Sequence, residues 1–183
     1  MKKKILLFGA GGHANSCIDV ILKTNKFKIV GLIGKKNELG KKICGFKVLG
    51  TEADAKFFFK EGVRNALITV GSYRNLKKRE KLFHYLKKIK FIFPKIISPT
   101  AYVSKNSKIN EGTIVMHGSI INSNSSIGSN CIINTKSLIE HDCLIENHVH
   151  ISTGSICNGS VKVGSGSFIG SGSVIRNNLT IKS

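Results

Sequence analysis

A repeat of six residues runs through the second half of the chain and limits what it can fold into. An amphipathic helix repeats its apolar residues about every 3.6 positions, and a half-buried strand every 2. A strict period of six fits neither element. No residue is inserted or lost across the run, which holds isoleucine or valine at every position but one: Ile97, Val103, Ile109, Val115, Ile121, Ile127, Ile133, Ile139, Ile145, Ile151, Cys157, Val163, Ile169, Ile175 and Ile181.

A second, smaller residue accompanies most of these aliphatic positions. One large β-branched residue and one small residue in every six predict a parallel β-helix, in which each short strand points one side chain into a narrow core. Three repeats make a triangular coil of about 18 residues. Stacked coils bury a core that no single repeat could bury alone. The small residues lie two positions before the aliphatic ones, at Ala101, Ser107, Thr113, Ser119, Ser125, Cys131, Ser137, Cys143, Ser155, Ser167 and Ser173.

The cysteines favour a reducing environment. Their number, five, is odd and no CxxC spacing occurs, so neither a disulfide framework nor a zinc ribbon is expected. Cys131, Cys143 and Cys157 fall on inward repeat positions and are predicted to be small core residues. The apolar run Ile5–Phe8 is too short for a signal peptide, and no stretch is long enough to span a bilayer. We expect a cytoplasmic protein that does not insert into membranes.

Length and charge divide the chain into two predicted domains, residues 1–96 and 97–183. The first carries 23 Lys and Arg against 6 Asp and Glu, the second 6 against 4, so nearly all of the net charge of +19 lies in the first. Such a basic region fits an anionic partner: a nucleic acid, a membrane surface or a phosphorylated small molecule. A solvated, lysine-rich surface is the alternative. The chain has no known nucleic-acid-binding motif, so we expect no nucleic-acid partner.

The first domain alternates predicted strands and helices. Strand Ile5–Phe8 is followed by Gly9, Gly11 and Gly12 and then by helical spacing from Ala14 to Leu22. Alternating β and α elements predict a small parallel sheet, and glycines after the first strand let a phosphate approach backbone N–H groups at a helix N-terminus. The later elements are predicted as strand 27–33, helix 52–62, strand 65–71 and a basic helix over 74–88.

The ligand of this glycine turn is predicted to differ from NAD. A dinucleotide site would carry an acidic residue after the second strand to bind the adenosine ribose. Here the chain has Gly34-Lys35-Lys36. We therefore expect a nucleotide sugar or another anionic ligand, and a tight turn with no ligand is the alternative.

His141 is the candidate catalytic residue. It follows the inward Ile139 by two positions, on an outward corner, and Gly159 lies one predicted coil above it. A carboxylate from Asp142 or Glu140 would hold one ring nitrogen and leave the other to accept a proton. Asn134, one repeat earlier, can donate a side-chain hydrogen bond.

Two other interpretations of the histidines remain. A single surface histidine is usually solvated, but His141, His148 and His150 fall within ten residues. Metal binding between subunits would need an HxxxxH pair, whereas the spacing here is HxxxxxxHxH. We expect no metal.

Three stretches resemble one known family over essentially the whole chain. They are GAGGHA after the first strand, ISPTAYVS at the start of the repeats, and INTKSLIEHDCLIENHVHISTGSICNGSVKVGSGSFIGSGSVI. They are similar to the sugar acyltransferases that include sialic-acid O-acetyltransferases of the NeuD type and UDP-amino-sugar N-acetyltransferases of the PglD type. The resemblance implies a small Rossmann-like α/β domain that binds a sugar or sugar nucleotide. It also implies a left-handed parallel β-helix that forms a homotrimer and binds the co-substrate acetyl-CoA between subunits.

The same resemblance implies roles for individual residues. His141 matches the general base, Asp142 the carboxylate that raises its basicity, and Asn134 an asparagine of the same site. The positions expected to bind acetyl-CoA are His150, Gly159, Gly170 and Ser171, and those expected to bind the substrate are Gly11, Gly12, His13 and Gly71.

Two departures from the family change these expectations. Family members usually have an acidic pair where this chain has Gly34-Lys35, so the usual contacts to the sugar nucleotide are altered. The chain also stops at Ser183, in mid-repeat, where the family continues for another coil or more. We therefore expect weak acetyl-CoA binding. The alternative to an enzyme is a non-catalytic or truncated trimeric relative that binds a sugar nucleotide.

Overall fold

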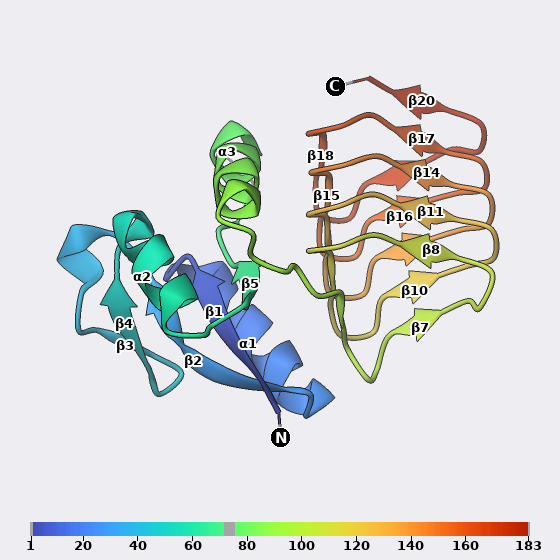
Figure 1. Cartoon of the computed structure of the whole chain (residues 1–183). Helices are drawn as coiled ribbons and strands as arrows, with labels where there is room; N and C mark the ends of the chain where they lie inside the picture. The colour runs from blue at the N-terminus through green and yellow to red at the C-terminus, as the bar shows by residue number, and fades with distance from the viewer. Residues whose placement is uncertain (1, 72–75, 183) are drawn as a thin grey trace.

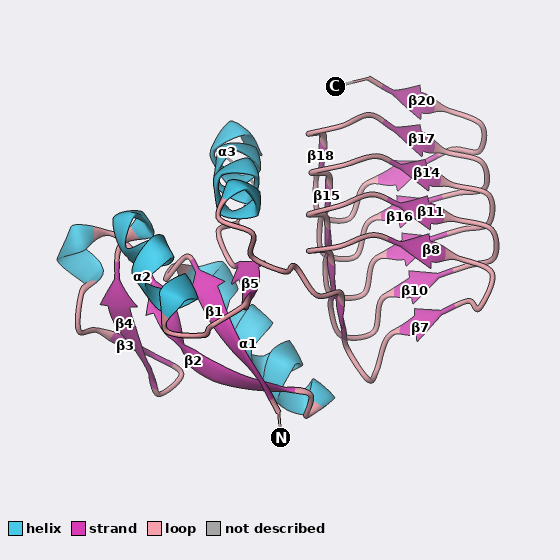
Figure 2. Cartoon of the chain, in the orientation of Figure 1, coloured by secondary structure: helices cyan, strands magenta, loops and turns pink. Residues whose placement is uncertain are grey.

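The computed structural model describes residues 2–71 and 76–182 and has an α/β part followed by a stack of coils (Figure 1). The α/β part precedes residue 96 and contains all of the described helices (Figure 2). The division into domains at residues 96 and 97 stays a prediction. The elements of the first part are β1 (Lys3–Phe8), α1 (Gly12–Thr24), β2 (Phe27–Ile33), η1 (Lys36–Glu38), β3 (Lys42–Ile43), β4 (Phe46–Gly50), η2 (Glu52–Asp54), α2 (Ala55–Lys60), β5 (Asn65–Ile68) and α3 (Leu76–Lys88).

The α/β part is built on a five-stranded sheet in the order β3-β4-β2-β1-β5. The interior strand β1 pairs in parallel with β2 and β5, and residues 5–8 are fully buried, as a buried parallel strand requires. The predicted strands and helices are present. Strand β5 is shorter than predicted, however, and the predicted helix over 52–62 begins as the 3₁₀ turn η2. Positions 74 and 75 of the predicted basic helix lie outside the described residues.

The antiparallel hairpin β3–β4 was missed by the sequence analysis. Its loop is Cys44-Gly45, and both residues have positive φ, 46° and 83°. Two left-handed residues form the tight turn that matches the twist of paired strands, but such turns are usually signalled by Asn-Gly or Asp-Gly. Cysteine at the first position hides the turn in the sequence.

The second part is a left-handed parallel β-helix, as predicted. Each strand pairs with the strand 18 residues later, as Ile121 does with Ile139, which confirms the coil length. Its two-residue strands are β6 (Ile96–Ile97), β7 (Tyr102–Val103), β8 (Lys108–Ile109), β9 (Ile114–Val115), β10 (Ile120–Ile121), β11 (Ser126–Ile127), β12 (Ile132–Ile133), β13 (Leu138–Ile139), β14 (Leu144–Ile145), β15 (His150–Ile151), β16 (Ile156–Cys157), β17 (Lys162–Val163), β18 (Phe168–Ile169), β19 (Val174–Ile175) and β20 (Thr180–Ile181).

The second residue of each strand points into the core, which confirms the period of six. The small residues two positions earlier also turn inward, and their hydroxyls bond to backbone carbonyls. Ser119 Oγ, for example, donates to the Asn134 carbonyl at 2.7 Å. Cys131, Cys143 and Cys157 are buried members of this core, as predicted. Among the residues that the structure describes, no buried hydroxyl of this core lacks a hydrogen-bond partner.

The first residue of each strand points outward, so the β-helix has three faces of different chemistry. The face formed by β6, β9, β12, β15 and β18 is covered by the α/β part, and its Ile114 and Ile132 share one hydrophobic cluster with Ile18 and Ile21 of α1. The face of β8, β11, β14, β17 and β20 is mostly polar. The face of β7, β10, β13, β16 and β19 presents an apolar column: Tyr102, Ile120, Leu138, Ile156 and Val174.

None of the described helices is long and apolar enough to cross a membrane.

Candidate active site

His141 and Asp142 form a hydrogen-bonded pair on the corner that follows β13. The two atoms, His141 Nδ1 and Asp142 Oδ2, lie 2.7 Å apart, and both side chains are about half-exposed. The carboxylate can only accept, so Nδ1 carries a hydrogen, and the neutral imidazole keeps its lone pair on Nε2. The hydrogen bond from His141, followed by one from Asn124, lowers the pKa of Asp142. The pair therefore has the geometry of a general base with its orienting carboxylate.

The backbone of this corner is held from both sides. Asp142 has φ of 59°, a left-handed conformation that Asp adopts more readily than most residues. Its N–H donates to the Ser123 carbonyl one coil below, while the His141 carbonyl accepts from Ser160 N in the coil above, at 3.0 and 2.9 Å. The imidazole therefore projects from a rigid support.

Gly159 lies against the His141 ring, as the repeat predicts. A Cβ atom on Gly159 would be 2.6 Å from His141 Cε1 and 2.7 Å from Nε2, closer than any real side chain could approach. The absence of a side chain at this one position is what lets the ring lie over the next coil. The free nitrogen is at that edge of the ring.

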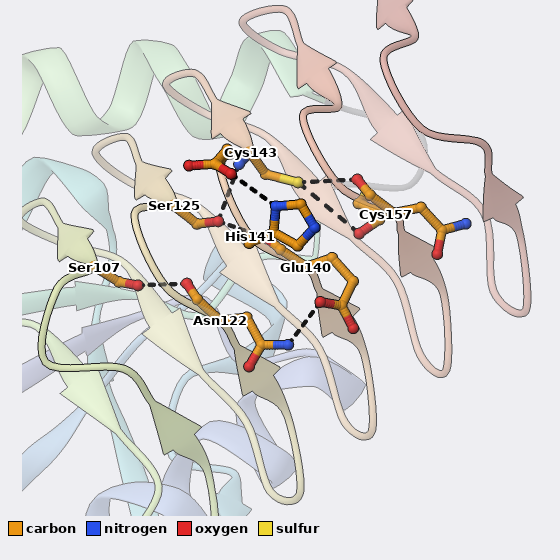
Figure 3. Close-up of polar contacts among 9 residues, drawn as sticks. Ser107, Asn122, Ser125, Glu140, His141, Cys143 and Cys157 are labelled. Atoms are coloured by element: carbon orange, nitrogen blue, oxygen red, sulfur yellow. Dashed lines mark hydrogen bonds and ion pairs between the residues drawn. The ribbon is translucent and has the colours of Figure 1, made fainter.

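Glu140, the other candidate carboxylate, has a different partner. Its Oε2 accepts from Asn122 Nδ2 at 2.9 Å, one coil below, and its carbonyl accepts from Ser125 Oγ (Figure 3). These contacts keep Glu140 within the stack. The structure thus distinguishes between two carboxylates that the residue pattern left open, and the one it pairs with His141 is Asp142, as the family resemblance implied.

Asn134 does not meet His141 within one chain. It lies at the corner that follows β12, where its Nδ2 is 3.1 Å from His150 Nε2. Gly170 occupies the same corner two coils above, and the neighbouring Ser171 Oγ bonds to Ser152 Oγ at 2.9 Å. The candidate residues are therefore divided between two corners of the triangle: His141, Asp142 and Gly159 on one, and Asn134, His150, Gly170 and Ser171 along the other.

His150 connects the β-helix with the α/β part. It occupies the outward position of β15, on the face that the α/β part covers, and its ring centroid lies 6.4 Å from that of His13. Burial lowers the pKa of His13 to about 3, and the charge of Arg79 and the proximity of His150 act in the same direction. Burial and Arg79 likewise lower the pKa of His150 to about 4. Both imidazoles are neutral at neutral pH.

Arg79 is a buried residue of this junction that the sequence analysis missed. It lies in α3, where its Nη1 donates to the carbonyls of Ile68 and Val70 and its Nε to that of Asn130. Burial lowers its pKa to about 10. In the sequence it stands among the lysines of a basic helix, and nothing there distinguishes it from an exposed residue.

The four predicted substrate positions line one pocket. Gly11, Gly12, His13 and Gly71 border a cavity of about 320 Å³ at the carboxyl ends of the parallel strands. Gly11 and Gly12 begin α1, where free backbone N–H groups and the helix dipole favour an anion. Lys35 and Lys78 line the same cavity together with Glu38 and Glu52, and Lys78 Nζ lies 3.6 Å from Glu52 Oε1.

The departure at Gly34-Lys35 has a structural counterpart in Glu38. Its Oε2 accepts from the Lys35 N–H at 2.6 Å and lies where a Cβ on Gly34 would come within 2.7 Å. Glu38 also lines the pocket. A carboxylate therefore does reach the end of β2, but from a position that spacing alone did not single out.

The three clustered histidines of the sequence separate in space. Among the described residues, His148 is the only one of His141, His148 and His150 that joins a group of possible metal ligands, and its partners there are Glu80 and His84. A site made from the three together is not formed within the chain.

Comparison with known proteins agrees with this architecture. Residues 4–86 match the family model of the PglD N-terminal domain. The acetyltransferase domain of PglB from Neisseria gonorrhoeae FA1090, solved with acetyl coenzyme A, superposes with a TM-score of 0.90 at 27% identity, over 100% of this chain and 86% of that one. No curated protein matches the sequence.

Two further solved structures share the fold. A variant of perosamine N-acetyltransferase from Caulobacter crescentus, in complex with CoA and GDP-perosamine, has a TM-score of 0.85 at 23% identity over 98% of this chain and 91% of its own. WeeI from Acinetobacter baumannii AYE has a TM-score of 0.74 at 21% identity over 98% and 94%.

An α/β domain of this type on a hexapeptide β-helix with a His–Asp pair defines the class of hexapeptide-repeat acyltransferases. Within that class, residues 4–86 are similar to the PglD N-terminal domain family, and the whole chain is similar in fold to the acetyltransferase domain of PglB.

Proposed function

We propose that this protein transfers an acetyl group from acetyl-CoA to an amino or hydroxyl group of a sugar, of the UDP-amino-sugar or sialic-acid type. The observation that carries the proposal is the His141–Asp142 pair, whose free Nε2 lies at the edge of Gly159. A cytoplasmic role in the synthesis of a bacterial surface glycan fits such a substrate.

The mechanism is general base catalysis. His141 Nε2 takes the proton of the acceptor N–H or O–H as that group attacks the thioester carbonyl carbon. The new C–N or C–O bond forms, the C–S bond breaks, and CoA leaves as the thiol after it receives the proton. Asp142 stabilises the imidazolium that forms in between. A backbone N–H of a neighbouring coil stabilises the developing oxyanion.

The pocket at Gly11, Gly12, His13 and Gly71 takes the sugar substrate. An anionic group, such as the diphosphate of a sugar nucleotide, is stabilised there by the N-terminus of α1, and Lys35 and Lys78 offset the charges of Glu38 and Glu52 in the same pocket. The perosamine N-acetyltransferase with the same fold was solved with GDP-perosamine. This support favours a nucleotide-linked sugar over a free one.

The complete site belongs to a homotrimer. Asn134 and His141 lie at the two corners that flank β13, so the apolar face of β7, β10, β13, β16 and β19 separates the halves of the site. Packing these faces between chains buries Ile120 and Val174, which are 39% and 61% exposed. It also places the His141 corner of one chain beside the Asn134 corner of another. Acetyl-CoA then binds between chains, against His150, Gly159, Gly170 and Ser171.

Thiol release from acetyl-CoA with a panel of UDP-4-amino sugars and sialic acids tests the activity. We expect turnover with one class of acceptor, and a loss of about 10²–10⁴-fold in kcat for His141→Ala. Glu140→Gln is the matched control, since this neighbouring carboxylate pairs with Asn122, and it should keep its rate. A His141→Ala variant within tenfold of the wild type would rule out the proposed base.

A second candidate is a binding protein for sugar nucleotides without catalysis. The four predicted substrate positions line one pocket within a single chain, whereas the candidate catalytic residues lie at two corners. Tight binding of a UDP-sugar without turnover of any acceptor, by a folded trimer, would favour this alternative.

A further inference from the structure

Three potential metal ligands meet where α3 lies beside the β-helix, away from the His141 corner. They are Glu80 and His84 of α3 and His148, which lies on the turn before β15. Their ligand atoms all lie within 4.8 Å of one another, and Glu80 Oε1 is 3.9 Å from His84 Nε2. No other group of three such residues gathers anywhere in residues 2–71 and 76–182.

The fold brings these residues together from two separate parts. Glu80 and His84 are four positions apart, so they lie on the same face of the helix. The backbone of the third residue, His148, is held by the β-helix. It has φ of 61°, and its N–H donates to the Ser129 carbonyl at 2.9 Å. Its ring packs edge-on against His84 and Phe83, with centroids 5.5 Å apart in both cases. The sequence separation between α3 and this turn means that only the folded chain forms the cluster.

We propose that Glu80, His84 and His148 bind a zinc ion that fastens α3 to the β-helix. Two imidazoles and one carboxylate are a common zinc ligand set, with a water molecule completing the tetrahedron. In such a site the ligand atoms lie about 3.3 Å apart, given metal–ligand distances of about 2.0–2.1 Å. The side chains of Glu80 and His84 are 47% and 59% exposed, so small rotations can close the remaining gap.

The surroundings of His148 suit a ligand. The residue is buried, with only 8% of its surface exposed, so it is held in place beside α3. Its Nδ1 lies 2.9 Å from the Asn130 side-chain amide, which leaves Nε2 for the ion.

Asn130 can support the metal-bound ring. Its amide oxygen is buried and has no hydrogen-bond partner among the described residues. A half-turn of the amide places that oxygen against Nδ1, where it accepts the N–H of a histidine whose Nε2 is on the metal. Carbonyl acceptors of this kind commonly orient zinc-bound histidines.

The ion would hold the helix that borders the proposed substrate pocket, and it would take no part in the chemistry of acetyl transfer. Helix α3 also carries Lys78, which lines the substrate pocket, and Arg79, which bonds across to Asn130. Zinc at this point ties the helix to the coil that holds His148. It would thereby fix the position of the pocket relative to the β-helix.

Zinc binding to the full chain provides the test. The protein is stripped with EDTA, desalted and titrated with ZnCl₂ in a calorimeter. We expect one ion per chain for the wild type and a loss of more than about tenfold in affinity for His84→Ala, because even residues that only orient a ligand contribute about 10–100-fold. His84 is exposed, so the variant is expected to fold. Cys44→Ser and His141→Ala are the controls for an exposed thiol and an exposed imidazole, and both should bind zinc as the wild type does.

A melting curve gives a second readout. Zinc should raise the Tm of the wild type and of the two control variants but not that of His84→Ala, since an ion that bridges two elements stabilises only the folded state. The proposal fails if the wild type binds no zinc. It also fails if His84→Ala binds zinc as tightly as the wild type, or if Cys44→Ser abolishes binding.

Discussion

The candidate active site depends at the residue scale on a position that has no side chain. His141 can lie over the next coil only because Gly159 leaves its Cβ position empty. The glycine backbone has an ordinary φ there, so space and not backbone conformation is what it provides. The imidazole orientation is then set by Asp142 on the other side of the ring.

Gly159→Ala should therefore impair catalysis without unfolding the protein. The added methyl group lies within 2.7 Å of Nε2 and must displace the half-exposed ring. We expect a loss of about 10²-fold in kcat, the size of effect that a displacement of about 1 Å can cause. Steady-state kinetics would measure it. In a His141→Ala background the same change should cost nothing more, and a full further loss there would contradict the role of Gly159.

The buried histidines His13 and His150 make a prediction about pH. Their folded-state pKa values, about 3 and about 4, lie below the ordinary value of 6.5. At pH values between the folded-state pKa and 6.5, each of these histidines is more often protonated in the unfolded chain than in the folded one. The free energy of unfolding therefore decreases as the pH falls below about 6.5. Each histidine contributes a slope of at most about 1.4 kcal/mol per pH unit.

Urea unfolding at several pH values between about 7 and 5 would measure this slope. His150→Asn removes one of the two groups and should flatten the pH dependence, whatever it does to the stability at neutral pH. A variant with the full wild-type slope would show that His150 is not neutral in the folded protein.

The β-helix shows at the element scale how two adjacent residues of one strand can differ completely in role. In β14, Ile145 is fully buried in the core, while Leu144 is 41% exposed on the mostly polar face. Hydrophobicity is almost the same at the two positions. Only the alternation of the strand separates them.

Ile145→Ala should lower the free energy of unfolding by about 2–5 kcal/mol, because it leaves a cavity in a core that cannot easily collapse. Leu144→Ala, the matched control one residue away, should change it by less than about 0.5 kcal/mol. Chemical denaturation of both variants would compare them. Similar losses for the two would mean that the register of the coil is wrong.

At the scale of the whole molecule, the three faces of the β-helix differ in chemistry and in what covers them. One is covered by α1 and its neighbours, one is mostly polar, and the third presents the apolar column of Tyr102, Ile120, Leu138, Ile156 and Val174. The proposed trimer follows from this division and from the separation of Asn134 and His141.

A pair of charge substitutions tests the trimer. Ile120 and Leu144 are 39% and 41% exposed but lie on different faces. Ile120→Glu should dissociate the assembly because it places a carboxylate in the apolar contact, whereas Leu144→Glu should leave a mass of three chains in sedimentation velocity. A monomeric wild type, or dissociation by Leu144→Glu alone, would contradict the arrangement.

Much of this protein was determined by local sequence. The period of six gave the β-helix, its coil length and its inward residues, because each repeat makes the same short-range turn and buries the same position. The glycine above His141 was predicted for the same reason, whereas the repeat left open whether Asp142 or Glu140 holds the ring. The Cys44-Gly45 hairpin was missed, since its turn has an unusual residue at a left-handed position.

The tertiary structure alone decided which distant residues meet. Burial of Arg79, the approach of His13 to His150, and the gathering of Glu80, His84 and His148 all arise where the α/β part packs on the β-helix. No periodicity in the sequence encodes these contacts. They depend on how two hydrophobic surfaces fit together, and a pattern along one chain segment carries no information about the surface that it will face.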